Sequence, residues 1–417
     1  MNCRGCGMPV HLTMIDLGTA PPSNAYISAA QLDQSEQWVP LRVRVCESCW
    51  LVQVEDYRAA DSLFDADYAY FSSFSSSWLA HAERYVVSMI ERFGLTAGSK
   101  VVEVAANDGY LLQYFAGHGI PCLGIEPTAS TACAARKKGL EIRELFFGQM
   151  VAGQLADEGW SADLMVANNV LAHVPDINDF LRGFAALLKP NGVATFEFPH
   201  LLRLMTEHQF DTLYHEHYSY LSLIAVQALC ARNGLTVFCV EELSTHGGSL
   251  RVFVQRAKGG HPVDPAVDAM LAREERSGLR TADYYATLSP AAERIKHELL
   301  RFLLQAKADG KKVVGYGAAA KGNTLLNYAG VRSDLLAWVA DANPHKQGKF
   351  LPGSRIPILA PAQIAEQKPD YVLLLPWNLS DELATELAYV QSWGGRLLVA
   401  VPVIRFLPSA SSSGRTQ

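Results

Sequence analysis

The stretch that decides the fold is Val101-Val-Glu-Val-Ala-Ala-Asn-Asp-Gly-Tyr-Leu-Leu112. It reads as a buried strand, a loop of small residues and the start of a helix. Small residues let a ligand approach the backbone closely at a helix N-terminus. The pattern therefore predicts a nucleoside site at the carboxyl end of a parallel strand. The candidate ligand-binding residues in it are Glu103, Ala105, Asn107, Gly109 and Tyr110.

A second acidic residue supports this site. Glu126 ends the next apolar run, near the place where such folds put a carboxylate that binds ribose hydroxyls. The Gly-x-Gly-x-x-Gly pattern of dinucleotide sites is absent, and Glu103 would repel a pyrophosphate. A cationic ligand that carries an amino acid suits Glu103 better, so we expect S-adenosylmethionine as the cofactor. The alternative is that both acids are solvated strand ends.

Strands and helices alternate outward from this loop, which is typical of a parallel sheet covered on both faces. Asn168 and Asn169 end the fourth expected strand, and His173 follows closely, so these side chains should converge on the cofactor crevice. We expect strands at 100–104, 121–125, 140–145, 162–167 and 192–198, helices at 110–116, 128–138, 149–156 and 177–188, and an edge hairpin formed by 236–242 and 250–255.

The C-terminal part repeats the alternation as a second, smaller Rossmann-like unit. Its first loop, Gly-Tyr-Gly-Ala-Ala-Ala-Lys-Gly, lacks the Walker pattern and the third Rossmann glycine, so we expect neither ATP nor a nicotinamide there. Gly317, Lys321 and Gly322 could hold a diphosphate in a backbone nest. The alternative is a glycine-rich turn that is needed only for packing. Strands are expected at 312–315, 336–340, 371–375 and 395–399, and helices at 320–329 and 360–366.

Four cysteines near the N-terminus form two Cys-x2-Cys pairs. Each pair directs two thiolates at one point, and two pairs supply the four soft ligands of tetrahedral zinc. Disulfides, or one redox pair beside a bystander pair, are the alternatives. With four sulfur ligands no position is left for water, so the zinc should be structural. The expected ligands are Cys3, Cys6, Cys46 and Cys49.

The segment Tyr214-His-Glu-His217 follows the fifth expected strand and crowds proton-transfer groups at the ligand end of the sheet. Histidine is the commonest general base near neutral pH, and a neighbouring carboxylate can orient it. We expect acid–base catalysis here. The alternatives are a polar loop with satisfied histidines, or a second metal site made by His215, Glu216 and His217.

Composition argues against several classes of protein. The formal net charge of -6 argues against a protein that coats nucleic acid. There is no basic start followed by an apolar segment, and no apolar run approaches the roughly 20 residues that cross a bilayer. We therefore expect a cytoplasmic protein with neither a signal peptide nor a membrane or nucleic-acid partner. The tail at 409–417 is Ser-rich and is expected to be disordered.

The motifs and their order resemble those of the three-domain, zinc-containing sugar C-methyltransferases, whose best-known members are dTDP-sugar C-3′-methyltransferases of deoxysugar pathways. The resemblance covers nearly the whole chain. It implies a mixed α/β protein with a zinc-binding domain at 1–72, a class I S-adenosylmethionine domain at 73–260 and a C-terminal Rossmann-like domain at 261–417 that helps to hold a nucleotide-sugar.

The resemblance also implies roles for single residues. His217 would be the base, Tyr214 and Glu216 would act beside it, and Tyr68 or Tyr70 would face the site. Asn169, His173 and His215 would lie near the sugar, and Asn168 near the cofactor. One departure is that the family usually has glycine where this chain has Ala105. Alanine is small enough to fit there if the backbone keeps a negative φ.

The function expected from these observations is C-methylation of a nucleotide-linked 4-keto-deoxysugar, dTDP-linked and at C3, through an enolate. An O- or N-methyltransferase of a nucleotide-sugar is the nearest alternative. Alternatives from other classes are a nicotinamide-dependent oxidoreductase and a non-catalytic zinc adaptor. The sequence leaves open the sugar, the nucleobase, the stereochemistry and the oligomeric state, a monomer included.

Overall fold

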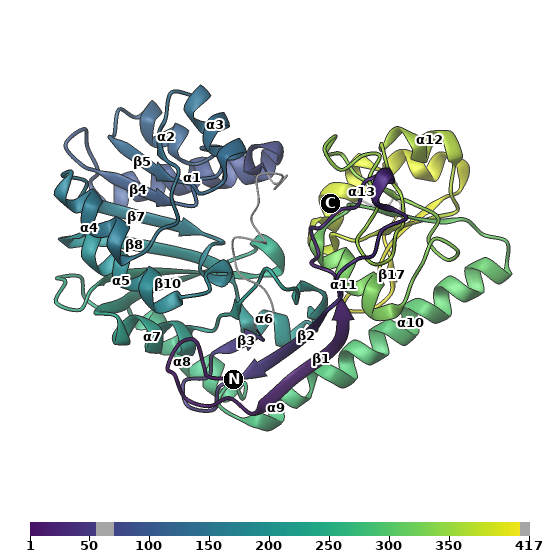
Figure 1. Ribbon diagram of the computed structural model, residues 1–417, viewed down its shortest axis with the longest axis horizontal. Coiled ribbons are helices and arrows are strands. Elements are labelled where there is room, and N and C mark those ends of the chain that lie inside the picture. Colours follow the sequence, from purple (N-terminus) through teal and green to yellow (C-terminus); the bar gives the residue numbers. More distant parts are fainter. Residues whose placement is uncertain (56–70, 409–417) are drawn as a thin grey trace, which may run out of the picture.

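The computed structural model describes residues 1–55 and 71–408. Tyr68, Tyr70 and the Ser-rich tail at 409–417 lie outside the described residues. Within them the strands form three sheets, and two α/β units stand side by side above an N-terminal sheet (Figure 1). The mixed α/β fold with two Rossmann-like sheets is the one expected from the sequence. No helix in the described part of the chain is long and apolar enough to span a bilayer.

The middle unit is built on a sheet with the order β10-β11-β8-β7-β4-β5-β6. The strands from β4 to β8 are parallel and almost entirely buried, as expected for a sheet covered on both faces. The hairpin β10–β11 joins its edge in antiparallel register, as expected. The strands are β4 (Val101–Val104), β5 (Cys122–Ile125), β6 (Glu141–Arg143), β7 (Ala162–Asn168), β8 (Leu188–Pro199), β10 (Leu235–Leu243) and β11 (Ser249–Arg256).

Helices cover both faces of this sheet. One face packs on α1 (Ser76–Phe93), α2 (Leu112–Gly117) and α3 (Ala129–Lys137). The other face packs on α4 (Gln149–Asp157), α5 (Ile177–Leu187) and α7 (Leu223–Arg232). Since both faces are covered, the carboxyl ends of the parallel strands are where a ligand can enter.

The N-terminal sheet has the order β1-β2-β3-β9. Its first three strands come from the cysteine-rich segment, whereas β9 follows the Tyr214–His217 segment by two residues and pairs with β3. Periodicity cannot predict this pairing, because a strand of two residues has none. The strands are β1 (Leu12–Ala20), β2 (Val39–Val45), β3 (Val52–Val54) and β9 (Ser219–Tyr220).

The C-terminal unit has the sheet order β14-β13-β12-β15-β16-β17. The long helix α10 (Leu288–Ala308) runs beside it, and its buried face belongs to a core that also includes β1 and β2 (Figure 1). The strands are β12 (Val313–Tyr316), β13 (Val339–Ala340), β14 (Ile358–Leu359), β15 (Tyr371–Leu374), β16 (Arg396–Val399) and β17 (Arg405–Phe406). The remaining helices are α6 (Leu201–Thr206), α8 (Pro265–Arg276), α9 (Ala282–Ala286), α11 (Ala320–Ala329), α12 (Ala362–Gln367) and α13 (Ser380–Glu386).

Candidate functional site

The loop after β4 is fastened to the acid after β5. One carboxylate oxygen of Glu126 accepts the Asn107 backbone N–H at 2.8 Å, and the other accepts the Thr128 N–H at 2.9 Å. Glu126 is 4% exposed, and burial raises its pKa while the two backbone donors oppose that shift. These bonds fix the direction of the carboxylate at the sheet edge, where it can still accept hydrogen bonds from a ligand.

Ala105 has φ +56°, in the left-handed region. The condition under which alanine fits here without strain, a negative φ, is therefore not met. The backbone follows the path that glycine takes in this turn, and a Cβ in that conformation costs about 1–2 kcal/mol. Asn107, two residues on, has φ +50° and pays a smaller penalty because asparagine tolerates this region. The loop is thus strained where the cofactor is expected.

Gly109 and Tyr110 serve the packing of this loop. Gly109 has φ +74°, and a Cβ there would lie 2.3 Å from Leu140 Cδ1. Glycine is thus required by the backbone and by the neighbouring side chain. The Tyr110 ring is buried and stacks with Trp78 of α1 at a centroid separation of 5.9 Å.

Two buried side chains at the carboxyl ends of β4 and β7 have oxygen atoms without a well-formed hydrogen bond among the described residues. Neither carboxylate oxygen of Glu103 nor Oδ1 of Asn168 has a hydrogen bond of good geometry there. Burial raises the pKa of Glu103 well above its usual range, and the nearby Tyr110 hydroxyl opposes this. Because orphaned buried acceptors are costly, these positions fit a ligand that brings donors and positive charge. The ammonium and sulfonium groups of S-adenosylmethionine meet that need.

His217, which is buried, and Tyr214, which is half-buried, form a hydrogen-bonded pair. His217 Nδ1 lies 3.2 Å from the Thr212 carbonyl oxygen, which can only accept, so the ring proton is on Nδ1. Nε2 then accepts a hydrogen bond from the Tyr214 hydroxyl, with 2.9 Å between the oxygen and the nitrogen. Burial, followed by the charges of neighbouring groups, lowers the pKa of His217 well below its usual range. The imidazole is therefore neutral near pH 7, with its lone pair directed at Tyr214.

Glu216 is separate from this pair. Its Oε1 accepts both the backbone N–H of Asn24 at 3.1 Å and the Asn24 side-chain amide at 3.3 Å. Neither ring nitrogen of His217 contacts it, so the expectation that Glu216 orients His217 is wrong, and the Thr212 carbonyl does so. His215 contacts the Pro40 carbonyl through Nε2 at 3.1 Å. The N-terminal domain thus holds the two central residues of the Tyr214–His217 segment.

Asn169 and His173 lie beside this segment. His173 Nδ1 contacts the Glu216 carbonyl oxygen at 2.7 Å, and its ring meets the His217 ring edge-on at 4.6 Å. Burial lowers the pKa of His173. Asn169 has φ +57°, and its backbone N–H donates to the Glu197 carbonyl at 2.6 Å. The fold thus brings both residues to the same side of the sheet as His217.

Lys321, in the first turn of α11, also reaches this region from the C-terminal unit. Its Nζ donates to Asn378 Oδ1 at 2.6 Å and lies 4.6 Å from the Trp377 ring centre. Burial lowers the pKa of Lys321 to about 8, which Asp211 opposes. Burial raises the pKa of Asp211 to about 6, and Lys321 opposes that shift. The positive charge of Lys321 in turn lowers the pKa of His217, which places the two groups within electrostatic reach.

Packing explains why glycine stands at both positions that were expected to hold a diphosphate, Gly317 and Gly322. A Cβ on Gly317, whose φ is +86°, would lie 2.5 Å from Pro376, and one on Gly322 would lie 2.8 Å from Leu375. The loop N–H of Ala318 is already taken by Asp341 Oδ2 at 2.7 Å.

Sequence reasoning missed a polar network behind the site. Glu197, fully buried at the end of β8, accepts hydrogen bonds from Arg251 at 3.0 Å and Thr245 at 3.0 Å, and its other neighbour is His81 at 3.0 Å. His246, next to Thr245, contacts the Asn169 amide. The sequence feature that could have predicted this network is an acidic residue, Glu197, within an apolar strand. It is a weak indication, because no partner of Glu197 stands near it in the sequence.

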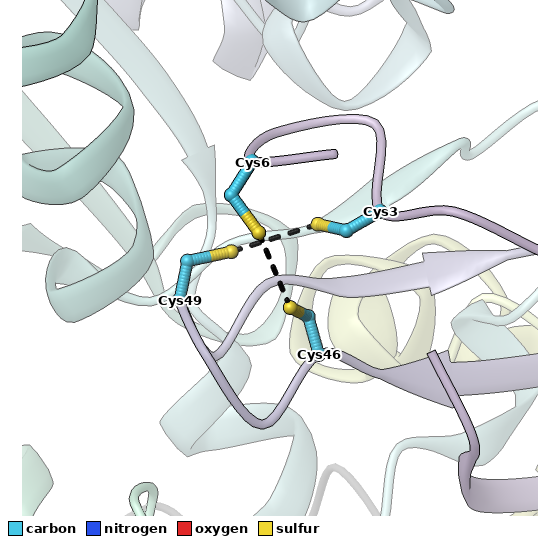
Figure 2. Close-up of side chains that lie close together, drawn as sticks. All are labelled: Cys3, Cys6, Cys46 and Cys49. Atoms are coloured by element: carbon cyan, nitrogen blue, oxygen red, sulfur yellow. Dashed lines mark hydrogen bonds between the residues drawn. The ribbon is translucent and has the colours of Figure 1, made fainter. Parts of the chain in front are cut away.

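The four cysteine thiols converge on one point (Figure 2). The Sγ atoms of Cys3 and Cys49 are 3.6 Å apart, and those of Cys6 and Cys46 are 3.5 Å apart. A tetrahedral zinc with Zn–S bonds of about 2.3 Å needs sulfurs about 3.8 Å apart, whereas a disulfide needs about 2.05 Å. The geometry fits zinc. In the described part of the chain no other group of His, Cys, Asp or Glu can hold a metal, so the His215–Glu216–His217 metal site is not formed.

Comparison with known families agrees with this geometry. Three family models match the chain: "Putative zinc binding domain" at 3–64, "Methyltransferase domain" at 78–240 and "C-methyltransferase C-terminal domain" at 244–402. The fold and site therefore define a zinc-binding, S-adenosylmethionine-dependent C-methyltransferase. The chain belongs to the family of the C-methyltransferase NovU of Streptomyces niveus, with 36% identity over 411 residues, 99% of this chain and 98% of NovU. The nicotinamide alternative is wrong.

More distant likenesses are partial. The ubiquinone biosynthesis O-methyltransferase of Rhodopseudomonas palustris (strain BisA53) is 29% identical over 97 residues, 23% of this chain and 38% of that protein. The solved structure of magnesium protoporphyrin IX methyltransferase (ChlM) from Synechocystis PCC 6803 with bound SAM has a TM-score of 0.33 and 15% identity, and covers 43% of this chain and 79% of that one. Likenesses this distant carry no conclusion about the substrate.

Proposed function

We propose that this C-methyltransferase acts on a nucleotide-linked 4-keto-deoxysugar, dTDP-linked, and methylates C3 through an enolate. The observation that carries the proposal is the hydrogen-bonded pair of buried His217 and half-buried Tyr214. A neutral imidazole near pH 7 can remove a proton, and carbon needs that removal before it can attack a methyl group. Oxygen and nitrogen acceptors do not need an enolisable ketone.

The residues act in this proposal as follows. When the sugar binds, the Tyr214 O–H turns to the ketone oxygen, which frees His217 Nε2 for the proton at C3. The C–H electron pair becomes the enolate double bond, and the negative charge moves to the ketone oxygen. S-adenosylmethionine supplies the electrophilic methyl group. The Thr212 carbonyl then stabilises the protonated His217 through Nδ1–H until the proton returns to solvent.

The C-terminal unit is proposed to hold the nucleotide, with the domains divided at 1–72, 73–260 and 261–417. Lys321 of this unit lies within electrostatic reach of His217, and Lys346 donates to the Ala318 carbonyl at 2.8 Å in the loop after β12. In this proposal, these two lysines supply positive charge to a diphosphate.

Solvent exchange tests the proposal. With S-adenosylhomocysteine bound, dTDP-4-keto-6-deoxyglucose should exchange a hydrogen next to its C4 ketone with deuterium oxide, and NMR distinguishes C3 from C5. His217→Asn should slow the exchange by roughly 10²-fold or more, since the amide cannot act as a base. The matched control is His297→Asn on the exposed face of α10. A product methylated on oxygen or nitrogen would end the proposal, and exchange at C5 alone would correct the methylated carbon.

A further inference from the structure

The turn between β10 and β11 holds a histidine in a strained conformation. His246 has φ +54°, and the two residues after it, Gly247 and Gly248, have φ +87° and +109°. Three consecutive residues with positive φ are unusual, and the first of them carries a ring. Such strain persists only where the surroundings over-determine it, and it concentrates at functional sites.

Two side chains and one backbone N–H from outside the hairpin fix this turn. The Thr245 hydroxyl donates to Glu197 Oε1 at 3.0 Å, and Glu197 is itself held by Arg251. The Gly247 carbonyl accepts from the Gln209 side chain at 2.8 Å. The Gly248 carbonyl accepts the His200 backbone N–H at 3.0 Å. Glu197 has no role in the proton transfer proposed above. We therefore infer that this hydrogen-bond network positions His246.

The His246 ring lies among active-site residues. Its Nε2 is 3.2 Å from the Asn169 side-chain nitrogen, an amide that can only donate, so Nε2 accepts and the ring proton is on Nδ1. Trp78 packs against the ring at 5.3 Å between centroids. The adjacent Gly247 touches the C-terminal unit, because a Cβ there would lie 2.6 Å from Trp377. His246 thus stands where the two units meet beside Lys321.

We propose that His246 is a second active-site imidazole, whose Nδ1–H donates a hydrogen bond to the ketone oxygen of the sugar and stabilises the enolate. This inference rests on the proposed function. A base and a donor on one ketone are the two requirements of enolisation, and a neutral imidazole can be that donor, as in triosephosphate isomerase. No hydrogen bond occupies Nδ1 within the described residues, so the donor is available to a ligand.

The charges around His246 keep it neutral. The pKa of His246 is lowered to about 4, mainly by burial and then by the charge of Lys321; Glu197 opposes this shift, and His81 adds a smaller lowering effect. Asn169, Trp78 and Gly247 complete its surroundings without charge. The ring is therefore neutral near pH 7 and can donate a hydrogen bond without giving up its proton.

Three substitutions separate a donor role from a packing role. In His246→Asn the amide nitrogen reaches the place of Nδ1, and asparagine tolerates the left-handed backbone. His246→Gln extends to the place of Nε2, which keeps the contact with Asn169 but not the donor. His246→Ala removes both. The control is His297→Gln on α10, whose side chain is exposed.

The readouts are exchange next to the ketone of dTDP-4-keto-6-deoxyglucose, kcat and KM of methylation, and the calorimetric Kd of S-adenosylmethionine. Loss of one such donor lowers rates by roughly 10²- to 10³-fold. We expect that loss in kcat and exchange for His246→Gln and His246→Ala, with KM and Kd within about threefold of wild type, and a loss under about tenfold for His246→Asn.

Equal loss in the Asn and Gln variants, or an unimpaired His246→Ala variant, would overturn the role of His246 while leaving the proposed function intact. Wild-type protein that neither exchanges nor C-methylates any 4-ketosugar of a small panel contradicts the proposed function itself, and the role of His246 falls with it.

Discussion

The two Rossmann-like units use the same device and differ in the charge beside it. In the middle unit, Glu126 accepts the N–H two residues ahead and the N–H of the loop after the first strand, at 2.9 and 2.8 Å. In the C-terminal unit, Asp341 accepts the N–H of Asn343 at 2.8 Å and that of Ala318 at 2.7 Å. One acid in each unit thus ties its own strand end to the neighbouring loop.

The surroundings of the two acids are opposite. Near Glu126 lies the buried carboxylate of Glu103, which has no cation beside it among the described residues. Near Asp341 lies Lys346, with Nζ 3.8 Å from Oδ2. The first loop therefore suits a cationic ligand, and the second, already neutralised, suits a neutral or anionic one. The acid thus has the same place in both units, and the charge beside it differs.

The largest effect is expected for Glu126→Gln, which tests whether the loop of the middle unit binds the cofactor. The substitution keeps the shape but removes the charge and leaves one backbone N–H facing an amide donor. S-adenosylmethionine affinity should fall by about 1.5–3 kcal/mol, roughly 10- to 100-fold, because a charge-assisted hydrogen bond contributes on that scale. Calorimetry with S-adenosylmethionine and with dTDP checks it. A loss of dTDP binding instead would show that the ligands have been exchanged between the units.

Lys346→Met tests whether the corresponding loop of the C-terminal unit binds the nucleotide. Asp341 then faces the ligand without its cation, so dTDP should bind about 1 kcal/mol more weakly, roughly fivefold, and S-adenosylmethionine unchanged. Adding Asp341→Asn should restore part of the loss, because the uncompensated charge is removed. If dTDP affinity does not respond to the single variant, the nucleotide does not lie against this loop.

A pH profile examines how the C-terminal cation acts on the middle unit. Lys321 lowers the pKa of His217 and of His246, so the neutral imidazoles persist to lower pH. Lys321→Met removes that charge, which raises both pKa values. The rate of exchange, which needs neutral His217, should therefore begin to fall at a higher pH on acidification. Lys307→Met, on the exposed end of α10, is the control. A profile that does not move would place Lys321 out of reach of the base.

The smallest expected effect concerns Ala105. Ala105→Gly relieves about 1–2 kcal/mol of left-handed strain but adds about 0.4–1 kcal/mol of unfolded-state entropy, so the protein should gain about 0.5 kcal/mol. The neighbouring Ala106, buried and outside the left-handed region, is the control, since glycine there should destabilise. Chemical denaturation of both variants measures the difference. Destabilisation by Ala105→Gly would mean that the methyl group contributes packing larger than the strain.

The sequence predicts those features that repeat or that stand close together along the chain. The alternation of strands and helices, the acid at Glu126 and the four cysteines are of this kind. The placement of Asn24 on Glu216 and of Thr245 on Glu197 is not, because each joins segments far apart in sequence by one or two hydrogen bonds. His246 had only a local signal, a histidine before two glycines in a hairpin turn. The positive φ of Ala105 could not be predicted for a related reason, since residue type alone does not fix φ.

The short pairing between β9 and β3 has a consequence for how metal supply governs chemistry. Val52, three residues after the zinc ligand Cys49, pairs with Tyr220, and the Val54 N–H donates to the Tyr218 carbonyl at 3.1 Å, one residue after His217. Backbone pairing thus links the segment that follows the thiolate cluster to the segment that carries His217. Removal of the zinc is therefore expected to disturb the position of His217, and methyl transfer should depend on metal loading.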